Sequence, residues 1–261
     1  MKAIIVAAGR GRRLGPETAE IPKCMVAVGG RPILHRQLDA LVAAGVDDVV
    51  IVRGYLGDKI QAPGYPVRFV ENPDWASNNI LASLMYAAHE MAGGFLFSYS
   101  DIVFAAEHVR RLVAMPDDQP DDIGLVVDRR WSEAYLGRVH HPIAEAELAH
   151  REDHPRGARI TRVGKRVVPA EQAAGEFIGL ARFSDGGGLA LRQIWQEAVA
   201  HGLERPFGTA ATLRQAYLSD ALNALAERDV ALTPLMIDGR WREIDTEEDL
   251  SRAHPVVDTW D

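Results

Sequence analysis

The sequence predicts an α/β fold in which helices cover both faces of a parallel sheet. Continuous apolar runs at Ala3–Ala8 and Val49–Val52 are typical of strands that are buried on both sides, and Val67–Val70 reads as a third strand. Pro32–Ala44 lies between the first two and carries apolar residues at helical spacing, and Gly45 then ends the helix. Strands that alternate with helices favour a parallel sheet. The 261 residues are 47% hydrophobic and 25% charged, which is enough for a large core and a polar surface.

The remaining elements follow in order along the chain. We expect strands at Phe95–Tyr99, Ile123–Val127, Arg159–Val163, Phe177–Arg182 and Ala231–Ile237. We expect helices around Leu81–Ala88, at Glu107–Met115, Leu189–Ala200 and Thr209–Ala226, and after Thr246. Asn72-Pro73-Asp74, Pro116–Asp122 and Asp238-Gly239 read as turns, and Glu145–Arg159 reads as a charged stretch.

A glycine-rich, cationic loop follows the first strand. Gly9 and Gly11 can adopt positive φ and let the backbone approach a ligand closely. Consecutive backbone N–H groups in such a loop can form an anion site. Gly9–Lys23 also carries more basic than acidic residues, in a chain whose net charge is −8. A phosphate ligand is therefore expected, the alternative being a surface turn with solvated arginines.

Two common phosphate loops do not fit this segment. The dinucleotide fingerprint G-x-G-x-x-G needs a glycine at position 14, but Leu14 stands there and the glycine comes at Gly15. A P-loop needs Gly-Lys-Ser/Thr, whereas Lys23 follows Pro22. A generic dehydrogenase is disfavoured for the same reason.

The run from Ala7 to Leu34 resembles the N-terminal signature of the nucleotidyltransferases that make sugar nucleotides and CDP-alcohols. The pattern G-x-G-x-R, followed at a distance by P-K, stands here at Gly9, Gly11, Arg13, Pro22 and Lys23. The resemblance implies a Rossmann-like three-layer fold with a mixed, mostly parallel central sheet. It also implies one domain over residues 1–261, with a small β-rich insertion at about 129–182 over the active site.

The resemblance further implies a nucleoside triphosphate substrate, Mg²⁺ and release of pyrophosphate. Arg13 and Lys23 take the catalytic positions, and Asp101 and Asp245 those of the metal ligands. Asp101 follows an expected strand, where ligands bind in open α/β sheets, although a turn or cap role is the alternative. The expected nucleotide-binding residues are Ala7, Ala8, Gly9, Arg10, Gly11, Asn78, Asn79, Ser83 and Ser100.

The segment Asn78-Asn79-x-x-x-Ser83 favours CTP. In the cytidylyltransferase branch a run of this kind lies beside the base, and amide and hydroxyl groups can pair with cytosine. The alternative is that these residues only cap the following helix.

The acceptor is expected to be phosphocholine or a small phosphonate such as 2-aminoethylphosphonate. An aromatic cage would suit a quaternary ammonium, and basic groups a compact anion. The candidate acceptor residues are Trp131, Tyr135, Arg138, His140, Lys165, Glu176, Trp241 and Glu243. Four histidines between His140 and His154 match no zinc spacing.

The sequence therefore predicts a Mg²⁺-dependent cytidylyltransferase. The alternatives are a hexose-1-phosphate nucleotidyltransferase that uses UTP or dTTP, and a silent nucleotide-binding subunit. The single cysteine, Cys24, favours a reducing, cytoplasmic setting and is expected to be a small buried residue. The acidic balance argues against nucleic-acid binding, and no apolar run is long enough to span a membrane. The sequence leaves open whether the protein forms a homodimer.

Overall fold

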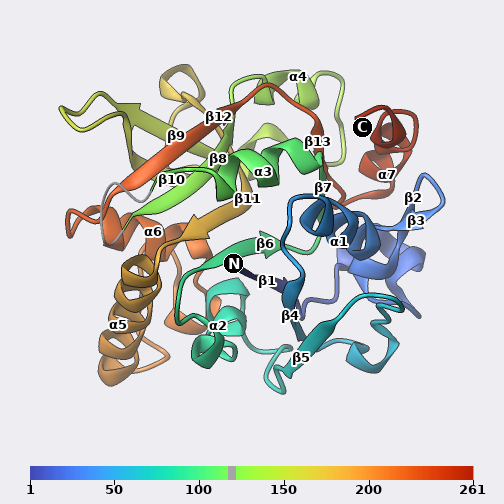
Figure 1. The fold of residues 1–261 in the computed structure, drawn as a ribbon, viewed down its shortest axis with the longest axis horizontal. Coiled ribbons are helices and arrows are strands. Elements are labelled where there is room, and N and C mark those ends of the chain that lie inside the picture. Colours follow the sequence, from blue (N-terminus) through green and yellow to red (C-terminus); the bar gives the residue numbers. More distant parts are fainter. Residues whose placement is uncertain (117–121, 261) are drawn as a thin grey trace.

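A mixed sheet forms the centre of the molecule in the computed structural model, which describes residues 1–116 and 122–260 (Figure 1). The order of its strands is β10-β9-β11-β6-β1-β4-β5, and β8 pairs with both β11 and β12. The strands are β1 (Lys2–Ala7), β4 (Asp48–Arg53), β5 (Val67–Glu71), β6 (Phe95–Tyr99), β8 (Ile123–Asp128), β9 (Glu147–Glu152), β10 (Arg159–Lys165), β11 (Gly175–Phe183) and β12 (Leu232–Ile237).

The first expected strand lies in the middle of the parallel part of this sheet. β1 pairs in parallel with β4 on one side and with β6 on the other, and β4 pairs with β5. β11 runs antiparallel to β6, β8 and β9, which makes the sheet mixed. The loops that follow β1 and β6 therefore emerge at the same edge, because the two strands point the same way.

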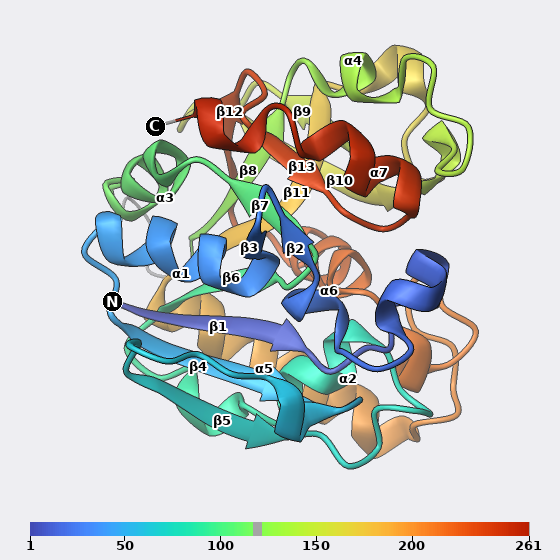
Figure 2. The same cartoon turned by 90° about the vertical axis from the view of Figure 1, so that its right-hand side faces the viewer.

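Helices cover both faces of the sheet, which gives three layers (Figure 2). Ile4 and Val6 of β1 belong to the core that contains α2, α5 and α6, whereas Ala3 and Ile5 belong to the core with α1 and α3. This alternation is the period of two that a strand imposes on its side chains. The helices are α1 (Ile33–Ala43), α2 (Ile80–Met85), α3 (Ala106–Val113), α5 (Asp185–His201) and α6 (Leu218–Ala226). The predicted α/β class is confirmed.

Short elements complete the fold around the edge of the sheet where β1 and β6 end. β7 (Ile102–Phe104) pairs antiparallel with β13 (Trp241–Glu243), and this pairing brings residues far apart in the sequence together. β2 (Ala27–Val28) and β3 (Arg31–Pro32) form a small hairpin. The helices α4 (Trp131–Tyr135) and α7 (Glu247–Ala253) complete the set.

Three expectations about the elements were wrong. Phe177–Arg182 belongs to β11, a central strand of the main sheet, and not to a peripheral insertion. The charged stretch after Glu145 contains β9, which pairs with β10 and β11. In Thr209–Ala226 only α6 is α-helical, because the Asp220 side chain accepts hydrogen bonds from Thr209 and from the Tyr217 backbone and folds the preceding segment back.

One expected turn and the possibility of a membrane-spanning helix remain to be considered. The expected turn at Pro116–Asp122 lies largely outside the described residues. Within residues 1–116 and 122–260, no helix combines the length and apolar character needed to cross a bilayer.

Candidate active site

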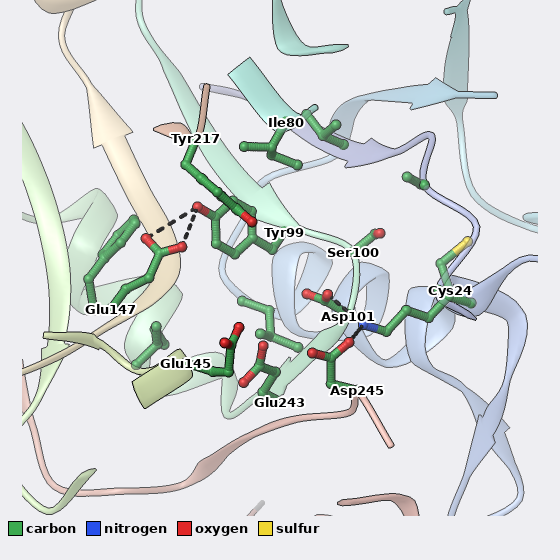
Figure 3. Close-up of a pocket in the computed structure, with 18 of the residues that line it drawn as sticks. Cys24, Ile80, Tyr99, Ser100, Asp101, Glu145, Glu147, Tyr217, Glu243 and Asp245 are labelled. Carbon is green, nitrogen blue, oxygen red and sulfur yellow. Dashed lines mark hydrogen bonds and ion pairs between the residues drawn. The ribbon is translucent and has the colours of Figure 1, made fainter. Parts of the chain in front are cut away.

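A cavity of about 260 Å³ opens where β1 and β6 end (Figure 3). Most of the sequence-predicted nucleotide, metal and catalytic residues line it: Ala7, Gly9, Gly11, Arg13, Lys23, Asn79, Ser100, Asp101 and Asp245. Four of the predicted acceptor residues line it as well: Lys165, Glu176, Trp241 and Glu243. The cavity therefore collects residues from both ends of the chain.

One lysine joins the two aspartates. The Lys23 ammonium donates to Asp101 Oδ2 at 2.7 Å and to Asp245 Oδ1 at 2.5 Å. Arg13 forms an ion pair with the other oxygen of Asp245. Burial opposes the charge of Lys23, but Asp101 and Asp245 outweigh it and hold the lysine pKa above its usual value. Two carboxylates and two cations thus form one compact centre.

The donor set fits a divalent ion. Asp101 Oδ1 is buried and has no hydrogen-bond partner among the described residues. Carboxylate oxygens are the ligands that Mg²⁺ prefers, and one oxygen of each aspartate lies within 2.7 Å of Lys23 Nζ, so the two carboxylates converge. Burial opposes ionisation of Asp245, but Lys23 and Arg13 lower its pKa, so this carboxylate is charged and ready to act as a ligand at neutral pH.

Gly11 lets the loop pass close to Lys23. Its φ is +66°, and a Cβ at this position would lie 2.8 Å from Lys23 Cβ and Cδ. Only glycine combines this backbone conformation with that approach at little cost. Gly9, in contrast, has open space where its Cβ would be and is not among the residues with positive φ.

We expect Gly11→Ala to lower turnover by more than its stability loss explains. The substitution costs about 1 kcal/mol for the positive φ and also displaces the Lys23 side chain from its aspartates. Gly45→Ala is the matched control, since Gly45 also has positive φ (+78°) but open space around its Cβ. Thermal melts and initial rates of both variants separate the two effects. Equal activity of the two variants would contradict this role of Gly11.

The polar segment before α2 is held mainly by its own hydrogen bonds. Asn72 Nδ2 donates to Asn78 Oδ1 at 3.0 Å and to Ser83 Oγ at 2.9 Å, so these side chains satisfy one another. Asn79 precedes α2 and makes no side-chain cap; its amide donates to the Gln215 carbonyl. Of the three predicted base-contacting residues, only Asn79 lines the cavity.

Buried carboxylates dominate the other half of the cavity. Burial raises the pKa of Glu147 to about 7 and, with the nearby Glu243 charge, that of Glu176 to about 8. Burial and the Asp245 charge raise the pKa of Glu243 to about 7. The Tyr135 hydroxyl donates to Oε1 of Glu176 at 2.7 Å. Oε2 of Glu176 is buried and has no hydrogen-bond partner among the described residues. This half would favour a cationic group.

Glu176→Gln is expected to stabilise the protein at pH 8.5 and to change little at pH 5. The native pKa of about 8 exceeds the ordinary value of 4.5, so the native state keeps a proton that the unfolded state loses. Native stability therefore falls as pH rises between these values, by on the order of 5 kcal/mol, because one pKa unit corresponds to about 1.4 kcal/mol. Glutamine removes that penalty. Thermal melts at both pH values measure the change in stability, and the exposed Glu227→Gln variant is the control. An equal gain in stability at both pH values would contradict the raised pKa of Glu176.

Several predicted residues do not line this cavity. Arg138 is tied to Asp249 by a hydrogen bond of 2.6 Å, and His140 is exposed. Trp131 packs in a small separate core, and Arg10 lies over the Tyr55 ring. The remaining ones are Ala8, Asn78, Ser83 and Tyr135.

Among the lining residues that the sequence did not predict as site residues, four carry a hydroxyl or carboxylate group: Tyr99, Glu145, Glu147 and Tyr217. Tyr99 donates to Glu147 (Figure 3). The Lys165 ammonium lies 3.1 Å from a Glu145 carboxylate oxygen and 5.2 Å from the centre of the Tyr217 ring. The position of Tyr99 just before Ser100-Asp101 was the one available signal, because the other three lie in segments read as a charged stretch or a helix. Cys24 also lines the cavity, and burial raises its pKa to about 12.

Comparison with known proteins agrees with this geometry. Residues 3–172 match the family model of the MobA-like NTP transferase domain. The chain is 29% identical to CTP:phosphoglutamine cytidylyltransferase of Campylobacter jejuni over 262 residues, which cover 96% of this chain and 98% of the relative. It is 36% identical to 2-aminoethylphosphonate cytidylyltransferase of Lancefieldella rimae over 111 residues, which cover 41% of this chain and 45% of the relative.

Two solved structures share the fold over nearly the whole chain. CTP:phosphocholine cytidylyltransferase from Streptococcus pneumoniae gives a TM-score of 0.73 at 20% identity, with 98% of both chains covered. UDP-glucose pyrophosphorylase from Acinetobacter baumannii gives a TM-score of 0.69 at 14% identity, with 97% of this chain and 91% of the other covered.

Proposed function

Because the chain belongs to the MobA-like NTP transferase family and is a nucleotidyltransferase, we propose that it transfers CMP from CTP to a small phosphorylated or phosphonate acceptor. An acceptor oxygen attacks the α-phosphorus of CTP. A new P–O–P bond forms, the bond between the α-phosphorus and the bridging oxygen breaks, and pyrophosphate leaves. Positioning and charge neutralisation supply most of the catalysis in such a reaction.

The convergence of Lys23, Arg13, Asp101 and Asp245 in one cavity carries this proposal. Arg13 and the backbone N–H groups of the Gly9–Gly11 loop would bind the β- and γ-phosphates. Lys23 would stabilise the negative charge that builds on the α-phosphate. Asp101 and Asp245 would hold Mg²⁺, which, when bound, neutralises phosphate charge and so reduces the repulsion between the two substrates.

The acidic half of the cavity supports an acceptor with an amine. Glu176 is only 3% exposed, and both Glu176 and Glu243 line the cavity beyond the two aspartates. The pKa values of both carboxylates are raised, and an ammonium group would favour their charged forms. Acceptors of this kind include phosphoglutamine, 2-aminoethylphosphonate and phosphocholine, which the relatives are named for.

Release of pyrophosphate tests the proposal. Purified protein with Mg²⁺ is incubated with each of CTP, UTP, dTTP and GTP, in combination with amine-bearing phosphates, phosphonates and hexose-1-phosphates. We expect release only with CTP and an amine-bearing acceptor. Release only with UTP or dTTP and a hexose-1-phosphate would replace the proposal with the sugar-nucleotide alternative. No release with any pair would favour the silent subunit. Two earlier expectations stay predictions: that residues 1–261 form a single domain, and that the protein could form a homodimer.

A further inference from the structure

A second cavity, of about 250 Å³, adjoins the first and shares three lining residues with it: Glu176, Trp241 and Glu243. Its other walls come from α4, from α7 and from Arg138 and Arg242. Figure 2 shows α7 beside β13, with α4 above them. A group held by Glu176 and Glu243 would therefore lie within reach of both cavities.

Arginines give this second cavity a different character. Arg138 donates to Asp249 at 2.6 Å, and Arg252 donates to the Leu136 carbonyl at 2.8 Å, so both are held by the protein. Arg242 is held by one backbone carbonyl and by the Trp260 ring, whose centre lies 5.9 Å from the guanidinium carbon. Its side chain makes one hydrogen bond within residues 1–116 and 122–260, to its neighbour's carbonyl, and forms no ion pair with any carboxylate there.

The surroundings of Arg242 call for an anion. The Arg242 side chain is half-buried, and this burial lowers its pKa. The positive charges of Arg252 and Arg138 lower the pKa further, whereas the negative charge of Asp128 raises it. A guanidinium in such surroundings gains from an anionic partner, and its planar fork matches a carboxylate with two parallel hydrogen bonds. The Glu133 carboxylate on the opposite wall is already paired with Arg130 at 2.6 Å.

Resting on the proposed function, we infer that the second cavity binds a carboxylate of the acceptor. The phosphoryl group lies near Lys23, the amine lies at Glu176 and Glu243, and the carboxylate lies on Arg242. The acceptor is therefore an amino acid that carries a phosphate or phosphonate on its side chain. Acceptors with an amine but no carboxylate, such as phosphocholine, would leave Arg242 without an anionic partner, so Arg242 determines specificity.

Two pairs of acceptors that differ only by the carboxylate test this inference. The pairs are O-phospho-L-serine with phosphoethanolamine, and 2-amino-4-phosphonobutanoate with 3-aminopropylphosphonate. We expect kcat/KM with CTP to be at least about 10-fold higher for the carboxylate member of at least one pair, as expected for a charged hydrogen bond. In Arg242→Gln this ratio should fall towards one, and in Arg242→Lys it should fall less. The exposed Arg129→Gln is the control that keeps the ratio.

Calorimetric titration of the protein with the same acceptors, in the absence of a divalent ion, measures binding separately from turnover. Tighter binding of a carboxylate member that is lost in Arg242→Gln supports the inference. Equal use and equal binding of both members of each pair overturn it, and the proposed function then stands if CTP is still consumed. If no acceptor releases pyrophosphate, the proposed function fails, and calorimetry alone decides whether Arg242 binds the carboxylate. Thermal melts confirm that each variant is folded.

Discussion

Replacing Lys23 by alanine is expected to lower turnover by about 100-fold or more. Loss of a donor that stabilises charge in the transition state often costs about 3–4 kcal/mol of barrier. The structure adds a second consequence, because Lys23 is also the cation between Asp101 and Asp245. Without it the two carboxylates repel each other, so the Lys23→Ala protein should melt at a lower temperature than wild type. Steady-state rates with saturating CTP and acceptor, together with thermal melts, measure both effects.

Added Mg²⁺ separates a local charge effect from general damage. A divalent ion can replace the missing ammonium between the aspartates, so Mg²⁺ should raise the melting temperature of Lys23→Ala more than that of wild type. Lys59→Ala is the control, since Lys59 is exposed and its side chain donates to the Glu20 carbonyl. Near-normal turnover of folded Lys23→Ala would refute the role assigned to this lysine.

Asp101→Asn and Asp245→Asn are each expected to lower turnover by about 100-fold or more. Asparagine keeps the shape of the side chain but removes a negative charge that the divalent ion needs. Asp245 is also held by Arg13 and is the more deeply buried of the two, so Asp245→Asn should shift the melting temperature more than Asp101→Asn does. Rates measured over a range of Mg²⁺ concentrations show whether the metal requirement has risen.

Asp238→Asn is the matched control for the aspartate variants. Asp238 lies seven positions before Asp245 and forms an exposed ion pair with Arg129, away from the cavity. Its removal should change turnover less than twofold, since exposed ion pairs contribute little to stability. A folded Asp101→Asn protein with wild-type rates and an unchanged Mg²⁺ dependence would rule out Asp101 as a metal ligand.

Local patterns in the sequence were sufficient for part of the fold and part of the site. The apolar runs that became β1, β4 and β6 identify their strands, because a strand buried on both faces must be apolar throughout. Gly11 and Asp101 were predicted as site residues from the segments that follow two strands, and the family resemblance gave Asp101 its expected role as a metal ligand. These features depend on residues that are close together in the sequence, so they can be predicted from the sequence alone.

The tertiary structure decided which polar side chains meet. β9 is charged and reads as a loop, but its pairing with β10 and β11 makes it a strand and turns Glu147 into the cavity. Arg138 carries the same charge as Arg242, yet one is neutralised by Asp249 from α7 and the other forms no ion pair within the described part of the chain. The sequence by itself determined most of the strands, and it predicted the phosphate loop and the two aspartates, Asp245 through the family resemblance. Only the pairing of distant segments decided which charges are neutralised, because electrostatic interaction depends on distance in space and not on separation along the chain.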